Sequence, residues 1–153
     1  MVNVQGDEPF VNRVALQQLI AAFESDEVKL ASLMKKIENP KNISDPNVVK
    51  LVTDLQQNAL YFSRSPIPYY RDQNQHPVFY EHIGVYAFRK EVLMKFSTWP
   101  QTFLEKAEKL EQLRYLEHGV KIKMIEVFEE TVKIDVPEDL EKAREFLKKL
   151  EGK

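Results

Sequence analysis

The sequence has 153 residues, of which 43% are hydrophobic and 30% charged, and its formal net charge is -2 at pH 7. This length predicts a single domain over residues 1–153 with one hydrophobic core, and the near-balance of charge argues against a nucleic-acid partner. The lack of cysteine excludes disulfides and thiolate chemistry. The sequence has neither an apolar run long enough for a membrane span nor the pattern of a signal peptide, so we expect a cytoplasmic protein with no membrane partner.

The stretch NVQGDEPFV, residues 3 to 11, places two carboxylates directly after the first apolar residues. Val2 and Val4 are typical of the end of a strand, and Gly6 favours a turn after it. Asp7 then follows the carboxyl end of a strand, where open α/β sheets bind ligands and where an aspartate suits a hard cation such as Mg²⁺. These nine residues alone favour the simpler interpretation, a polar turn between strand and helix.

The first half of the chain carries alternating helix and strand patterns. In chain order they predict an amphipathic helix over residues 12–24 with Asn12 as its N-cap, a strand over 28–37, a loop over 38–47, and a hairpin of two antiparallel strands over 48–53 and 59–64.

The second half continues the alternation. It predicts a loop over 65–78, a strand over 79–88, a short helix over 90–96, a helix over 102–117 with a Thr102/Glu105 capping box, and a strand over 120–128. A last helix from Pro137 is predicted to bury Leu140, Ala143, Leu147 and Leu150. The whole order predicts an α/β fold: a mixed, mostly parallel sheet with flanking helices and an antiparallel hairpin.

Five stretches, taken together, resemble the CMP-Kdo synthetases (3-deoxy-manno-octulosonate cytidylyltransferases) of Gram-negative bacteria. They are, in order, NVQGDEPF, ALYFSRSPIPYYRD, HIGVYAFR, LEQLRYLEHGVKIK and IDVPEDLEKAR, so the similarity runs from residue 2 to about residue 147. Each motif is weak alone, but five in register are specific. The resemblance implies a nucleotide-diphospho-sugar transferase-like fold and an enzyme that uses CTP to activate the acidic sugar Kdo.

In the reaction that the family implies, the C2 hydroxyl of Kdo attacks the α-phosphorus of CTP and pyrophosphate leaves. The product, CMP-Kdo, then enters lipopolysaccharide synthesis. Such a transfer needs a metal ion to neutralise phosphate charge and to orient the attacking oxygen. By resemblance, Asp7 and Asp135 are the catalytic aspartates that coordinate Mg²⁺.

The family also implies a sugar-acid pocket, which falls on Gln5, Arg64, His82, Tyr86, Glu111 and Gln112. Arg64 suits a bidentate pair with the Kdo carboxylate. His82 and Tyr86 are four residues apart, which places both on one face of a strand. Without the family, a surface cation, two half-buried strand residues and a solvated helix face explain these positions as well.

The chain departs from the family pattern at two places. A basic loop of the type P-A-R-x-x-S-T-R…K-P, which holds the CTP triphosphate in the family, is not found in these 153 residues. We therefore expect the chain to correspond to the C-terminal part of the enzyme and to be inactive alone. The metal motif reads KIDVPEDL where the family has G-V-D-T-P-E-D-L, so that Lys133 adds a positive charge near the expected cation, and Val136 replaces a helix-capping threonine. Asp135 is then able to cap that helix itself, with Glu138 as its partner.

The family implies a homodimer, and residues 59–88 are the expected contact segment. Its apolar and aromatic residues exceed what a small monomer exposes: Tyr61, Phe62, Ile67, Tyr69, Tyr70, Phe79 and Tyr80. Two alternatives stay open for the function. One is a non-catalytic sugar-acid-binding or dimerisation module, and the other is a relative that acts on another acidic sugar, such as a sialic acid.

Overall fold

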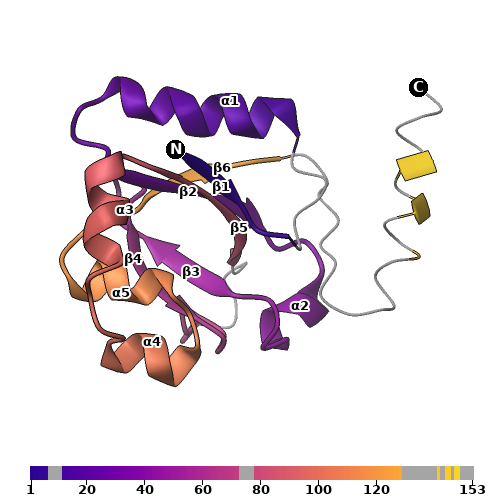
Figure 1. Ribbon diagram of the computed structural model, residues 1–153. Coiled ribbons are helices and arrows are strands. Elements are labelled where there is room, and N and C mark those ends of the chain that lie inside the picture. The colour runs from indigo at the N-terminus through magenta and orange to yellow at the C-terminus, as the bar shows by residue number, and fades with distance from the viewer. Residues whose placement is uncertain (7–11, 73–77, 129–140, 142–143, 146, 149–153) are drawn as a thin grey trace.

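A six-stranded sheet forms the middle layer of the computed structural model, which describes residues 1–6, 12–72 and 78–128 together with residues 141, 144, 145, 147 and 148 (Figure 1). The strands are β1 (Val2–Val4), β2 (Leu30–Lys36), β3 (Lys50–Thr53), β4 (Ala59–Ser63), β5 (Tyr80–Phe88) and β6 (Lys123–Glu126). Their order in space is β4-β3-β5-β2-β6. β1 pairs with the second half of β5, along the edge of β5 that β3 uses in its first half.

The strand directions confirm a mixed sheet but correct the expectation that it is mostly parallel. Of the five pairings among the described residues, only β2 with β6 is parallel. The reason lies in β5, which runs against β1, β2 and β3 alike. Only the connection from β2 to β6 ends in a parallel pairing, and parallel pairing requires a long crossover of this kind.

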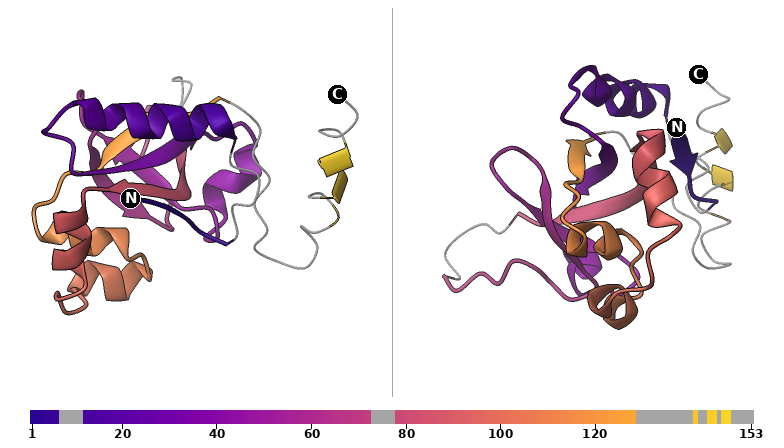
Figure 2. Two further views of the ribbon diagram at one scale, coloured as in Figure 1. Left: turned by 45° about the horizontal axis from the view of Figure 1, so that its top comes forward. Right: turned by 60° about the vertical axis from the view of Figure 1, so that its left-hand side comes forward.

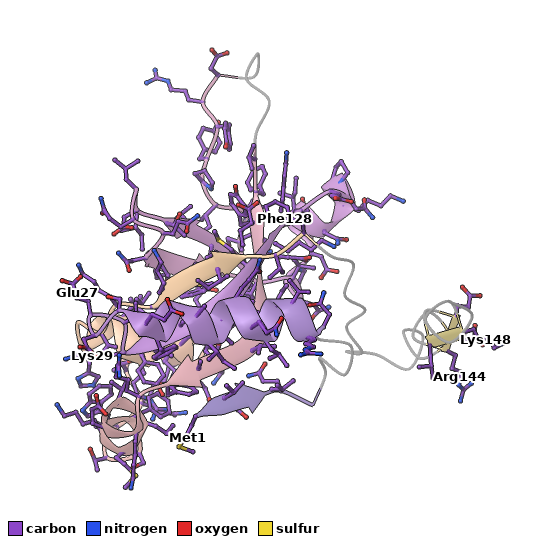
Figure 3. The ribbon with its side chains drawn as sticks, turned by 90° about the horizontal axis from the view of Figure 1, so that it is seen from above. Met1, Glu27, Lys29, Phe128, Arg144 and Lys148 are labelled. Carbon is purple, nitrogen blue, oxygen red and sulfur yellow. The ribbon has the colours of Figure 1, made fainter. Side chains whose placement is uncertain are left out.

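Five α-helices flank the sheet in the described part of the chain: α1 (Arg13–Ala21), α2 (Pro40–Ser44), α3 (Lys90–Phe96), α4 (Phe103–Glu108) and α5 (Gln112–Glu117). A short 3-10 helix, η1 (Ala22–Glu24), follows α1 directly. α1 covers one face, and α3, α4 and α5 gather on the other side (Figures 1 and 2). From above, α1 lies across the sheet with β1 beside it, starting at Met1 (Figure 3). Asn12 caps α1 as predicted, since its side-chain oxygen accepts from the Ala15 N–H at 2.7 Å. No helix in this part of the chain is long and apolar enough to cross a membrane.

Two helical segments differ from the sequence prediction. α2 lies in a stretch predicted to be a loop, because Asn39 accepts from the Lys41 N–H at 3.1 Å and the following Pro40 suits the first helical position. The predicted helix over 102–117 is instead two helices, since Lys109 adopts the left-handed conformation (φ 56°, ψ 47°). The capping box of Thr102 and Glu105 is confirmed at the start of α4.

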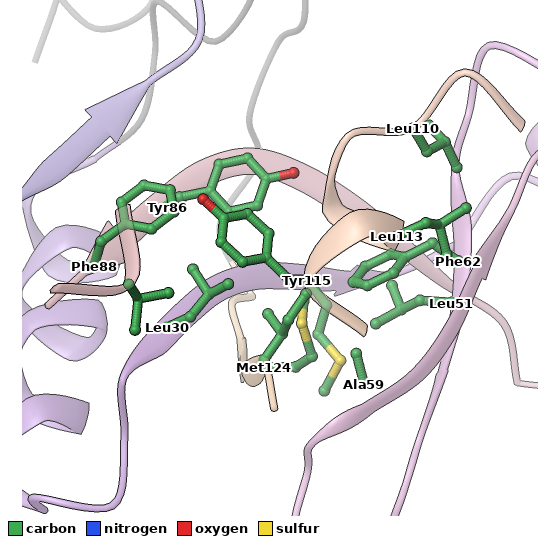
Figure 4. Close-up of a cluster of buried hydrophobic side chains, with 13 residues drawn as sticks. Leu30, Leu51, Ala59, Phe62, Tyr86, Phe88, Leu110, Leu113, Tyr115 and Met124 are labelled. Carbon is green, nitrogen blue, oxygen red and sulfur yellow. The ribbon is translucent and has the colours of Figure 1, made fainter. Parts of the chain in front are cut away.

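The sheet carries a hydrophobic core on each face because apolar residues alternate along its strands. Under α1, Ala15 and Leu19 pack on a cluster from β2 and β5. The larger cluster on the other face joins Leu30, Phe62 and Leu113 with the rings at the end of β5 (Figure 4). Most of the predicted last helix lies outside the described residues, and Leu147, which was expected to be buried, is 44% exposed.

Candidate functional site

A cavity of about 280 Å³ opens between the β1/β5 pair and the helices α3 and α5. Three residues predicted to bind the sugar acid line it: Gln5, Tyr86 and Glu111. They come from the start, the middle and the last third of the chain, so the fold brings together what the sequence separates. The remaining wall is mostly apolar or aromatic and consists of Met1, Val2, Asn3, Phe88, Leu93, Phe96 and Tyr115.

Gln5 is held at the cavity by the middle of β5. Its backbone N–H donates to the Gly84 carbonyl at 3.1 Å. Its side chain lies directly over Gly84, where an added Cβ would stand 2.1 Å from the amide oxygen of Gln5. A glycine inside a strand marks such a close approach, and here it is needed to seat the Gln5 amide.

His82 and Tyr86 lie on one face of β5, as their spacing predicts, with ring centroids 5.3 Å apart. His82 also meets the Phe62 ring edge-on at 5.1 Å. On its other side, the His82 Nε2 atom lies 2.9 Å from the hydroxyl oxygen of Ser32 on β2. The imidazole is thus held by a ring on β4 and a hydroxyl on β2.

The pairing of β5 with β2 is interrupted beside His82. Ser32 pairs with Tyr86 but its neighbour Leu33 pairs with Ile83, so β5 carries two surplus residues, Gly84 and Val85. Such a bulge re-aims the side chains around it. The Gly84 carbonyl, which accepts from the Gln5 N–H, belongs to this bulge.

Three aromatic rings form the inner wall of the cavity. The Tyr86 and Phe88 rings are 5.8 Å apart, and the Phe88 and Tyr115 rings are 6.0 Å apart (Figure 4). Burial raises the pKa of Tyr115 to about 12. Its hydroxyl therefore stays protonated near neutral pH and can donate a hydrogen bond.

Glu111 and Gln112 lie at the start of α5 and not in the middle of a helix, as the sequence suggested, because the chain breaks at Lys109. Glu111 is exposed toward the cavity mouth, while Gln112 is buried. Glu111 and Tyr115 are four residues apart, which puts them on one face of α5 and explains why both line the cavity.

Arg64 follows β4 and does not line this cavity. Its guanidinium is bound to backbone carbonyls: Nε donates to Glu108 at 2.8 Å and Nη1 to Pro46 at 2.7 Å. Its backbone N–H donates to the Glu108 carboxylate at 2.9 Å. Arg64 therefore ties β4 to α4, and its contact with a sugar carboxylate stays a prediction.

The two predicted metal ligands, Asp7 and Asp135, lie outside the described residues, as do Lys133, Val136 and Glu138. In the part of the chain that the structure describes, no three histidine, aspartate or glutamate side chains are grouped so as to hold a metal ion. The Mg²⁺ site therefore stays a prediction.

Sequence reasoning missed the apolar half of the cavity. Phe88 alternates with Tyr86 along β5, and Tyr115 follows Glu111 by one helical turn, so both periodicities were present in the sequence. Asn3 and Phe96 gave no comparable signal, because their place depends on how β1 and α3 pack.

Comparison with known proteins gives close relatives. The chain is 51% identical over 150 residues to the 3-deoxy-manno-octulosonate cytidylyltransferase of Christiangramia forsetii and 50% identical over 151 residues to that of Flavobacterium johnsoniae. These alignments cover 96% and 97% of the chain but 60% and 62% of the relatives. The chain thus spans about three fifths of the length of these relatives.

Solved structures agree with this similarity. The structure of a CMP:2-keto-3-deoxy-manno-octonic acid synthetase complexed with CTP superposes with a TM-score of 0.89 at 37% identity, over 97% of this chain and 61% of that one. A putative glucose-1-phosphate thymidylyltransferase from Bacillus anthracis in complex with sucrose, at 15% identity and a TM-score of 0.60 over 95% of this chain and 53% of that one, shares the fold alone. A sequence profile of the cytidylyltransferases matches residues 1–122. With most of its length matched by that profile, the chain belongs to the cytidylyltransferase family.

Proposed function

We propose that this chain provides the sugar-acid part of a cytidylyltransferase that transfers CMP from CTP to Kdo and releases pyrophosphate. The observation that carries the proposal is the cavity, which brings together Gln5, Tyr86 and Glu111. The chain that forms it is 51% identical to a protein named 3-deoxy-manno-octulosonate cytidylyltransferase. In the transfer, a bond forms between the C2 oxygen of Kdo and the α-phosphorus of CTP. The bond from the α-phosphorus to the bridging oxygen breaks, its electron pair stays on the leaving pyrophosphate, and the hydroxyl proton passes to water. A cytoplasmic location stays a prediction.

The cavity residues divide the work of recognition by their chemistry. The Gln5 amide and the Glu111 carboxylate suit sugar hydroxyls, because each offers acceptors and Gln5 also offers donors. The rings of Tyr86, Phe88 and Tyr115 give the apolar surface against which a pyranose ring can lie. Such a mixed lining holds a small polar ligand in one orientation, as in-line transfer requires.

Asp7 and Asp135 would hold Mg²⁺, because carboxylate oxygens are its preferred protein ligands. When bound, the ion would neutralise charge on the transferred phosphate. The described residues would meanwhile bind the sugar acid and keep its reacting hydroxyl in place.

Calorimetry of the wild-type chain with Kdo, and separately with a sialic acid, tests the proposal. We expect Kdo to bind and the sialic acid to bind more weakly. Preference for the sialic acid would favour a relative with another substrate, and binding of neither sugar would favour a dimerisation module.

The same titration tests Arg64. Arg64→Lys keeps the charge but loses the planar fork, so we expect Kdo to bind at least about threefold more weakly. Arg89→Lys is the matched control, since the Arg89 guanidinium also binds backbone carbonyls, those of Phe23 and Val28, at a place that does not line the cavity. Equal Kdo affinity in the two variants would leave Arg64 with its structural role only.

We also propose a homodimer that uses residues 59–88. Phe62 and Phe79 are buried in the core, so the expectation that they add to the exposed apolar surface of this segment is wrong. Leu60 and Tyr69 support the proposal, being 60% and 89% exposed. Light scattering at micromolar concentration should report a dimer that Leu60→Lys weakens, whereas a monomeric wild-type chain would contradict it.

A further inference from the structure

Ser32 is a buried hydroxyl with three polar neighbours on one strand. It lies in the middle of β2 and is 0% exposed. Its oxygen is 2.9 Å from the Val85 carbonyl oxygen, 3.3 Å from that of Ile83 and 2.9 Å from Nε2 of His82. All three neighbours belong to β5, at and beside its bulge.

The proton count at Ser32 settles which group donates to which. A serine hydroxyl has one hydrogen, and a carbonyl oxygen can only accept. If the hydroxyl hydrogen pointed to His82, the oxygens of Ser32 and Val85 would stand 2.9 Å apart with no hydrogen between them. If it points to Val85, the Ser32 oxygen accepts from an Nε2–H of His82, and each short contact holds one hydrogen.

From this geometry we propose that Ser32 is a positioning residue for the sugar-acid site: its hydroxyl keeps Nε2 of His82 protonated and holds the bulge that presents Gly84 to Gln5. In the neutral imidazole the single ring hydrogen is then on Nε2 and not on Nδ1. The part of the inference that concerns Kdo rests on the proposed function, whereas the assignment of the His82 tautomer is independent of it.

The bulge extends the effect from His82, a binding residue by resemblance that does not line the cavity, to Gln5, which does. Ser32 donates to the carbonyl of Val85, the residue after Gly84, and the Gly84 carbonyl accepts from the Gln5 N–H at 3.1 Å. One hydroxyl thus sets the imidazole directly and the Gln5 amide through the backbone. Because β2 is buried at this point, Ser32 itself does not touch the ligand.

The direct test is the tautomer of His82 in the wild-type chain. Long-range ¹H–¹⁵N spectra of histidine-labelled protein, assigned with His82→Gln, should show a protonated Nε2 and an unprotonated Nδ1 above the titration of the ring. In Ser32→Ala, the two nitrogen shifts should move toward each other as the tautomers mix. A wild-type Nδ1–H tautomer, or spectra unchanged in Ser32→Ala, would overturn the proposal.

Ser63→Ala is the matched control for this measurement. Ser63 is also a buried strand serine, 3% exposed, and its hydroxyl donates to the Glu108 carboxylate at 2.7 Å. The Ser63→Ala variant loses a buried hydrogen bond that does not involve His82, so the nitrogen shifts of His82 should stay as in the wild type. If Ser32→Ala does not fold, Ser32→Cys keeps the size and a weak donor, and the wild-type tautomer decides the question in any case.

Binding separates the inference from the proposed function. Losing one hydrogen bond at the imidazole should weaken Kdo binding roughly two- to tenfold in Ser32→Ala. In a His82→Gln background the same change should add much less, because the two residues act as a pair. If the losses of Kdo affinity in the two variants were fully additive, the positioning role would be overturned. If the wild-type chain did not bind Kdo, the proposed function would be overturned, and the His82 tautomer alone would decide the inference.

Discussion

The position of the Gln5 side chain depends on Gly84, because the side chain lies where a Cβ of residue 84 would be. Gly84→Ala would place a methyl group 2.1 Å from the Gln5 amide oxygen, so the amide must leave its position. We expect a folded protein that binds Kdo roughly two- to tenfold more weakly, the share of one hydrogen bond. Calorimetry measures the loss. Gly6→Ala is the control, because a Cβ at Gly6 meets open space, and an equal loss in both variants would refute the account.

Lys50 makes stability depend on alkaline pH. The side chain is fully buried, and its ammonium donates to the Asp45 and Val48 carbonyls at 2.7 and 2.5 Å. Burial lowers the pKa of Lys50 below the ordinary 10.5; Asp45 and Glu108 oppose this shift and Arg64 adds to it. Between the two values the unfolded chain binds more protons, so the contribution of Lys50 to stability grows as pH rises toward 10.5.

Lys50→Met should remove this rise, because the variant has no proton to release there. Urea unfolding from pH 7 to 11 measures the rise as the difference in unfolding free energy between wild type and variant. Because both proteins have the same tyrosines, the contribution of the tyrosines to the pH dependence cancels in this difference. Lys36→Met, at an exposed position of β2, should keep the wild-type slope. Parallel curves for wild type and Lys50→Met would show that the ammonium is not buried in solution.

The helix pair α4 and α5 is locked by an ion pair that exists only because the helix breaks. Glu105 and Arg114 are nine residues apart, which on a continuous helix of about 3.6 residues per turn would put them on opposite sides. The turn at Lys109 folds the chain back, so that Arg114 Nε donates to Glu105 at 2.7 Å while its guanidinium lies 4.1 Å from the Phe96 ring centroid.

The ion pair should appear as acid sensitivity. The hydrogen bond from Arg114 is the main reason why the pKa of Glu105 lies below its ordinary 4.5, so its contribution is complete above that pH and is lost as pH falls through the lowered value. Glu105→Gln keeps a capping side chain but loses the charge, and should cost about 3 kcal/mol near pH 7. Thermal unfolding from pH 7 to 3 checks both effects, with exposed Glu91→Gln as the control, and an unchanged midpoint in Glu105→Gln would contradict them.

Elements with local signals were predictable, and those fixed by tertiary contacts were not. Asn12 capped its helix, the hairpin formed, and β5 kept the spacing of His82 and Tyr86. The left-handed turn at Lys109 could not be predicted, because no glycine marks it. The directions of the strands outside the hairpin could not be predicted either, because tertiary contacts decide which strands pair. In the site, motifs located Gln5 and Glu111, but a buried serine such as Ser32 looks like any strand residue.

For the whole molecule, we expect that the 153-residue chain with CTP, Kdo and Mg²⁺ forms no CMP-Kdo above the uncatalysed background. Positioning and charge neutralisation supply most phosphoryl-transfer catalysis, and these residues contain no basic loop for the triphosphate. A coupled assay for pyrophosphate checks this. Adding a fragment that carries the P-A-R-x-x-S-T-R loop should restore turnover, and Asp7→Asn should abolish it. Steady pyrophosphate release from the chain alone would refute the expectation.

The surplus of two residues in β5 preserves the alternation of side chains along the strand. Because strand side chains alternate with a period of two, an even insertion leaves each flanking residue on its original face, whereas an odd one would turn half of the strand inside out. Tyr86 and Phe88 accordingly stay on the face of Leu30, and Val85 and Ala87 on that of Leu33. The two surplus residues, Gly84 and Val85, therefore bend β5 without moving any flanking core residue to the other face of the sheet.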